Sequence, residues 1–198
     1  LGQGNHLNKG SKLAVGRFIA IGHGDDINLP GRFAEQLAAL SKNPAIDLAA
    51  TWIEYIGEKK GIWKGPVNSR DCFAGLLMDS ILAHPTVMFK RDKLLSTGNY
   101  YRQEFVPAED YDLWVRLSPF CSFYNVPKVL LQYRVHRDQI SPQKEALIQD
   151  RIDRIRDNII NYFLANADNS SILFLKQLWN FKAGSRITFE MISNIPKL

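Results

Sequence analysis

Residues 17–26, RFIAIGHGDD, predict the strand and turn on which the fold depends. The run RFIAI is short and apolar, which is typical of a buried strand. The next five residues are polar and rich in glycine, so they form a turn at the carboxyl end of that strand. Leu29-Pro30 then opens a segment with apolar residues at helical spacing, which predicts a helix with proline in its first turn.

The alternation of strands and helices continues along the chain. We predict the end of a helix at 8–14, strands at 47–55, 86–89, 122–125 and 129–135, a turn or hairpin at 57–65, and helices at 71–82, 91–96 and 108–117. This alternation indicates an α/β fold, in which helices flank a sheet. Ligands of such sheets bind beyond the carboxyl ends of the strands, which is where the turn at 22–26 lies.

A helical extension is predicted after the alternating part. Residues 142–165 carry apolar side chains at helical spacing, and the pattern becomes weak after Asn169. We therefore predict two parts, a domain at residues 1–141 and an extension at residues 142–198. The charges between the apolar positions have mixed signs, which favours a solvated helix face over a lipid-binding one.

The composition excludes several classes of protein. Hydrophobic residues make up 45% and charged residues 23% of the 198 residues, as in ordinary globular proteins. No apolar run approaches the roughly 20 residues that cross a bilayer, and no signal peptide is evident, so we expect a cytoplasmic protein that is at most peripheral at the inner membrane face. The net charge of +5 comes from scattered basic residues, which argues against nucleic acid as a partner. Cys72 and Cys121 are far apart and predict neither a disulfide framework nor a zinc site.

Four segments, in order and at fitting spacing, resemble the family 2 glycosyltransferases. The strongest is EDYDLW at 109–114 followed by YRVH at 133–136. The others are NKG with AVGRFIA at 8–20, GDDINLPGRF at 24–33 and AHPTVMFKR at 83–91. The resemblance implies a GT-A-like fold, of which this chain would be the C-terminal portion of the catalytic domain, without the N-terminal nucleotide-binding segment.

The resemblance also implies a reaction and its residues. A sugar would pass from a nucleotide-diphosphate donor to a hydroxyl of a carbohydrate or lipid-linked acceptor, with inversion, in bacterial surface polysaccharide synthesis. Asp25 and Asp26, with His23 in place of the family's first aspartate, would hold a divalent manganese or magnesium ion on the diphosphate. Asp110 would be the general base, with Glu109 beside it.

Two further residues of the YRVH segment join this site by resemblance. His136 would add a metal ligand or a phosphate contact, and Arg134 would contact phosphate. Their spacing places both on the same face of a strand. Two other residues have mainly structural interpretations: we expect Trp114 to be a core residue and His84 to be structural, hydrogen-bonded behind the acceptor site.

Other interpretations remain open from the residues alone. The pair Asp25 and Asp26 could cap the helix that starts near Leu29, and the acids at 109–110 could only stabilise a helix dipole. The whole chain could be a catalytically inactive fragment or pseudoenzyme that serves as a binding or structural subunit. In that case a completing chain or a second copy would cover the exposed edge of its sheet.

Overall fold

The computed structural model describes residues 3–98, 100–136 and 142–179. The chain divides into two compact units, Leu1–Asp153 and Arg154–Leu198. The boundary predicted after residue 141 lies outside the described residues.

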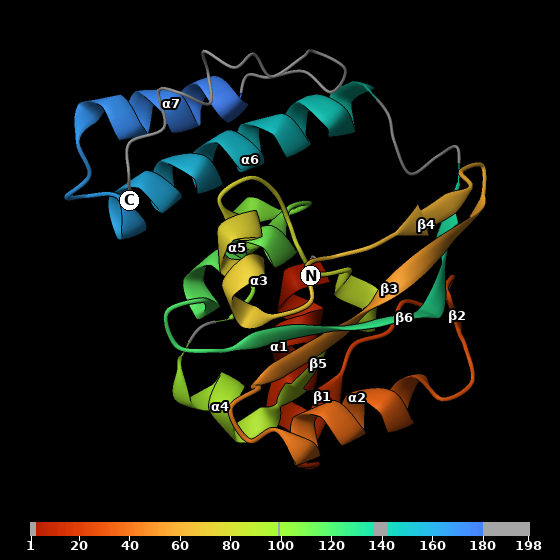
Figure 1. Cartoon of the computed structure of the whole chain (residues 1–198). Helices are drawn as coiled ribbons and strands as arrows, with labels where there is room; N and C mark the ends of the chain where they lie inside the picture. The colour runs from red at the N-terminus through yellow and green to blue at the C-terminus, as the bar shows by residue number, and fades with distance from the viewer. Residues whose placement is uncertain (1–2, 99, 137–141, 180–198) are drawn as a thin grey trace. The chain divides into compact units, whose positions relative to one another are not determined.

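A mixed sheet forms the centre of the first unit (Figure 1). Within the described residues it has six strands, in the order β1 (Phe18–Ala20), β5 (Met88–Lys90), β3 (Leu48–Gly57), β6 (Phe123–Val135) and β2 (Ile27–Asn28), with β4 (Gly61–Trp63) paired to β3. The long strands β3 and β6 run parallel, and the other pairs are antiparallel. The α/β prediction is confirmed.

Short helices precede the first strand and connect the others. They are α1 (Gln3–Leu13), α2 (Arg32–Lys42), α3 (Ser69–Leu76), α4 (Arg91–Ser96) and α5 (Glu109–Leu117), with single 3-10 turns η1 (His84–Thr86) and η2 (Gln103–Phe105). Helix α2 packs on β3 and β6, whereas α3 packs on β6 and α5. Figure 1 shows α2 on one side of the sheet and α3 and α5 on the other. The predicted helix at 91–96 is confirmed, and the one at 108–117 begins one residue later.

Several predicted elements differ from the structure. The strand expected at 86–89 is β5 at Met88–Lys90, and Thr86 belongs to η1. The strands expected at 122–125 and 129–135 form the single strand β6. Pro127, which has no N–H to donate, lies where the pairing with β3 passes from Val126 directly to Val129, so the strand continues through an irregularity rather than ending. The helix expected at 71–82 starts at Ser69 and ends at Leu76.

The second unit is helical in its described part. Helix α6 (Pro142–Phe163) enters it from the first unit, and α7 (Asn169–Trp179) forms where the sequence pattern is weak. Ile155, Ile159 and Leu175 are buried, and the Arg156 guanidinium lies 5.3 Å from the centre of the Trp179 ring. No helix in the described part of the chain is long and apolar enough to cross a membrane.

Helix α5 is fixed to the first unit by a buried carboxylate. Asp112 is 1% exposed and bonds two guanidinium groups, from Arg102 before the helix and from Arg116 one turn later. Trp114 on the same helix is fully buried, as expected. Asp112 is therefore structural, and it sets the position of the residues at the start of α5.

We predict that Asp112→Ala lowers the free energy of unfolding by about 3 kcal/mol, because it leaves two partly buried cations without their anion. Denaturant unfolding measures the change. The matched control is Glu35→Gln, which breaks the exposed pair with Lys128 and should cost less than about 0.5 kcal/mol. Equal losses in the two variants would contradict the role assigned to Asp112.

Candidate active site

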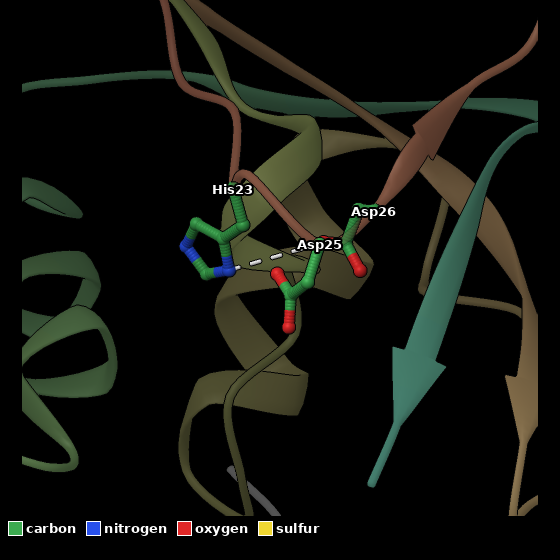
Figure 2. Close-up of side chains that lie close together, drawn as sticks. All are labelled: His23, Asp25 and Asp26. Atoms are coloured by element: carbon green, nitrogen blue, oxygen red, sulfur yellow. Dashed lines mark ion pairs between the residues drawn. The ribbon is translucent and has the colours of Figure 1, made fainter.

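The acidic turn lies between β1 and β2, at the end of the strand where the sequence predicts it. The Ile21 N–H donates to the Val87 carbonyl at 2.8 Å and so extends the pairing of β1 into the turn. His23, Asp25 and Asp26 each offer a ligand atom, and the three atoms lie within 4.8 Å of one another. Figure 2 shows the imidazole and the two carboxylates grouped on this turn. His23 Nδ1 lies 3.8 Å from Asp26 Oδ2.

Asp26 is the buried member of this group. Its side chain is 2% exposed, and its Oδ1 accepts the backbone N–H of Arg134 at 2.9 Å. Its Oδ2 is buried and accepts no hydrogen bond from any residue that the structure describes. Burial raises the pKa of Asp26, and the Arg134 N–H acts in the opposite direction. A carboxylate oxygen in this state suits a cation.

The capping interpretation of the turn is wrong. Helix α2 is capped by Gly31, with φ of 83°, and no side chain bonds its first N–H groups. Asp26 bonds strand β6 instead. Because this bond joins residues more than a hundred positions apart, the sequence pattern could not distinguish it from a local cap.

Strand β6 brings two more predicted residues to the turn. Arg134 Nε donates to the Asp25 carbonyl at 3.0 Å, and His136 Nε2 lies 3.6 Å from Asp25 Oδ2. His136 and Asp25 are both about half exposed on their side chains. The structure therefore groups the five residues predicted for metal and phosphate, from two distant segments.

Arg32 is buried against the acidic turn and supports its backbone. The sequence did not predict this role. Arg32 is 1% exposed, donates to the Ile21 carbonyl at 2.8 Å and to Gln36 Oε1 at 3.1 Å, and bonds Asn28. Burial lowers the pKa of Arg32 to about 10, and the negative charge of Asp26 partly opposes this change. An arginine in the first turn of an amphipathic helix normally indicates a solvated side chain, so only the fold shows its role.

The predicted base lies at the start of α5. Asp110 is half-buried, and its Oδ1 accepts the Tyr111 N–H at 2.8 Å. Burial raises the pKa of Asp110 to about 7, and the neighbouring charge of Glu109 adds to the effect. Glu109 is 4% exposed, and burial raises its pKa too. The bond to the first helical turn fits the interpretation that these acids stabilise α5, but the raised pKa values require burial as well.

A tyrosine lies within electrostatic reach of both acidic groups. Burial raises the pKa of Tyr133, and the charges of Asp26, Asp25 and Asp110 raise it further. The acids of the turn and of the start of α5 therefore raise the pKa of the same phenol, although they come from segments far apart in the sequence.

Hydrogen bonds between side-chain rings connect the acidic turn to two buried residues farther along the chain. His23 Nε2 lies 3.0 Å from Nδ1 of His84, and His84 Nε2 lies 3.0 Å from the hydroxyl of Tyr101. Burial, with a smaller contribution from His23, lowers the pKa of His84 to about 3, so the ring is neutral. His84 was expected to be structural and hydrogen-bonded; its partners are His23 and Tyr101.

The donor set fits a divalent cation. Carboxylate oxygens are the preferred ligands of magnesium and manganese, and imidazole nitrogens are compatible with transition metals. The grouped ligand atoms and the buried Asp26 Oδ2 are the structural features that match such an ion. The same region could accept the phosphates that such an ion binds.

Known proteins similar to this chain are glycosyltransferases by name. The chain is 29% identical over 147 residues, 73% of its length, to the amylovoran biosynthesis glycosyltransferase AmsE of Erwinia amylovora. It is 31% identical over 140 residues, 68% of its length, to an uncharacterized glycosyltransferase of Methanocaldococcus jannaschii. A third relative is a UDP-Gal:alpha-D-GlcNAc-diphosphoundecaprenol beta-1,3-galactosyltransferase of Escherichia coli, 28% identical over 70% of this chain.

The chain spans about half the length of these relatives, namely 54%, 48% and 51%. No family model matches it. Among solved structures, residues 1–349 of S. aureus TarS superpose with a TM-score of 0.63 at 16% identity, over 98% of this chain and 57% of that fragment. The TarS complex with UDP-GlcNAc gives the same TM-score. The fold is thus shared with TarS.

The pKa of Asp110 predicts how its replacement changes stability. The pKa is higher in the folded state, about 7, than the ordinary value of 3.8. The stabilising contribution of the protonated group is therefore fully present below the lower value and is lost as the pH rises through the higher one.

We predict that Asp110→Asn raises the thermal midpoint above that of the wild type at about pH 8, and raises it much less at about pH 5. The midpoint should rise by roughly 2–4 °C for each kcal/mol. The control is Asp92→Asn, whose side chain is 92% exposed and which should change neither midpoint. A shift that is the same at both pH values would contradict the raised pKa.

Proposed function

We propose that this chain is part of a glycosyltransferase of family 2 and GT-A type, which transfers a sugar from a nucleotide-diphosphate donor to an acceptor hydroxyl with inversion. The observation that carries the proposal is the grouping of His23, Asp25 and Asp26 on the turn with Arg134 and His136 from the end of β6, which matches the metal and phosphate contacts that such a donor needs. The names of the relatives support a setting in bacterial surface polysaccharide synthesis.

The donor side would be formed by the turn and β6. Asp25, Asp26, His23 and His136 would hold a manganese or magnesium ion, and Arg134 would contact phosphate. When bound, such an ion offsets the negative charge that develops on the diphosphate leaving group. Asp26 is pre-positioned for this task, because one of its oxygens is fixed by the Arg134 N–H and the other is buried and available.

The acceptor side would be formed by the start of α5. Asp110 would take the proton from the acceptor hydroxyl as its oxygen attacks the anomeric carbon. A base with a pKa near 7 is ionised in a useful fraction at neutral pH and still binds a proton strongly. Glu109 would strengthen this base, since its negative charge favours the protonated form of Asp110.

Relatives indicate the chemical class of the substrates. TarS forms a complex with UDP-GlcNAc, and the galactosyltransferase relative is named for UDP-Gal and a diphosphoundecaprenol-linked acceptor. We therefore infer a nucleotide-diphosphate sugar as donor and a carbohydrate or lipid-linked acceptor. The reaction would take place in the cytoplasm or at the inner face of the membrane.

We predict that Asp110→Asn reduces sugar transfer at least ~100-fold, because the amide cannot accept the proton. Transfer from labelled UDP-sugars to a lipid-linked acceptor, with manganese present, measures the rate. The wild-type rate should rise as the pH increases through about 7, where Asp110 loses its proton.

The control for this experiment is Asp92→Asn, which should transfer at the wild-type rate because Asp92 lies on the exposed surface of α4. Retained transfer by a folded Asp110→Asn variant would remove Asp110 from the mechanism. Absence of transfer by the wild type, with no donor bound, would favour the inactive binding subunit.

A further inference from the structure

His84 lies directly behind the turn and contacts the candidate metal ligand His23. It comes from η1, sixty-one positions later in the chain, and its Nδ1 is 3.0 Å from His23 Nε2. Its other nitrogen, Nε2, is 3.0 Å from the Tyr101 hydroxyl. His84 and Tyr101 are 7% and 4% exposed, so their polar atoms depend on one another rather than on solvent.

The three rings are held in place by their surroundings. Tyr101 is fixed on its backbone by Asn8, which accepts the Tyr101 N–H at 2.9 Å and donates to its carbonyl at 2.7 Å. The fully buried Trp114 ring lies 6.1 Å from the His84 ring, centre to centre. His84 therefore has little freedom to rotate away from His23.

A neutral imidazole has one donor and one acceptor nitrogen, so this chain of hydrogen bonds has two possible directions. In the first, His84 Nδ1 donates to His23 Nε2, and the remaining proton of a neutral His23 sits on Nδ1. In the second, His23 Nε2 donates to His84 Nδ1 and His84 Nε2 donates to the Tyr101 oxygen. Only the second direction leaves a lone pair on His23 Nδ1, the atom 3.8 Å from Asp26 Oδ2.

The surroundings of Tyr101 favour the second direction. In that direction the Tyr101 hydroxyl proton is free to point toward negative charge. Burial raises the pKa of the Tyr101 hydroxyl, and the negative charges of Asp110 and Glu109 raise it further, so the hydroxyl keeps its proton. A proton directed at these charges leaves the phenol oxygen to accept from His84, and this arrangement is also the one that leaves His23 Nδ1 bare beside Asp26.

We propose that His84 and Tyr101 are positioning residues for the metal site, which keep the proton of His23 on Nε2 and present its Nδ1 as a ligand beside Asp26. The inference rests on the metal site of the proposed function. It explains how a histidine can take the place of an aspartate in the turn, because a second residue fixes which nitrogen is bare. The chain of hydrogen bonds also connects the metal site to the buried Tyr101 hydroxyl.

The tautomer itself can be measured without any metal. Long-range ¹H–¹⁵N spectra of the imidazoles distinguish a proton on Nδ1 from one on Nε2. For the metal-free wild type we expect His23 protonated on Nε2. In Tyr101→Phe, which removes the acceptor at the end of the chain, this preference should weaken. A wild-type His23 protonated on Nδ1 would overturn the proposal.

The second readout is manganese affinity, from the decrease of the free-ion signal in electron paramagnetic resonance. Replacing residues that support metal ligands typically weakens affinity by 10–100-fold, so we expect a loss of about tenfold for Tyr101→Phe and a larger one for His84→Leu. His84→Asn should retain most of the affinity, because its amide oxygen can accept from His23 Nε2 in place of Nδ1.

The matched control is Tyr100→Phe, since Tyr100 is the neighbouring tyrosine and its ring contacts Lys12 rather than His84. It should bind manganese as the wild type does. If His84→Leu fails to melt cooperatively, Tyr101→Phe carries the test alone. Wild-type affinity in folded Tyr101→Phe would overturn the proposal. A wild type that binds no manganese would refute the metal site of the proposed function, and the tautomer spectra would still decide the direction of the chain.

Discussion

The buried carboxylate of Asp26 is the constraint on which the site depends. One of its oxygens bonds the backbone of β6, which fixes the turn between β1 and β2 to a strand from the far end of the domain. Its other oxygen is enclosed without a hydrogen bond from any described residue. Enclosing a charge in this way is unfavourable, as the raised pKa of Asp26 reflects, and a cation beside it would offset that cost.

The fold brings the two halves of the site together through the parallel pair β3 and β6. Because β6 continues past its irregularity at Pro127, its carboxyl end reaches the turn with Arg134 and His136. The buried Asp112 and its two arginines hold helix α5 in place, which fixes the position of Asp110 at the start of this helix. A structural carboxylate and a candidate catalytic one thus lie two residues apart on the same helix, and only their burial and partners distinguish their roles.

The sequence predicted the local units of this fold well. The apolar run and the glycine-rich turn at 17–26, and the short helix at 91–96, have signals contained within a few residues, and the structure agrees with them. Interactions between distant residues were not predictable in the same way. The strand β6 was divided in two because Pro127 normally ends a strand, and Asp26 could not be distinguished from a helix cap without its partner in β6.

The candidate site shows the same contrast between local sequence patterns, which were predictable, and contacts between distant residues, which were not. The resemblance of the four segments selected the turn and the acids at 109–110 as candidates, whereas the residues alone left a cap and a helix dipole as alternatives. Neither indicated the roles of Arg32 and Tyr101, whose importance comes from being buried against the turn or the histidines. For His84 the sequence suggested a hydrogen-bonded structural residue, but its partner His23 is visible only in the fold.

The most direct test of the central claim is thermal unfolding with manganese, with UDP, and with both. A ligand at 100 times its dissociation constant adds about 2.7 kcal/mol to stability, and each kcal/mol raises the midpoint by roughly 2–4 °C in a protein of this size. We expect a clear rise only when both are present, and no rise in Asp26→Asn. An unchanged midpoint in a wild type that melts cooperatively, or an equal rise in Asp26→Asn, would contradict a metal–diphosphate site centred on Asp26.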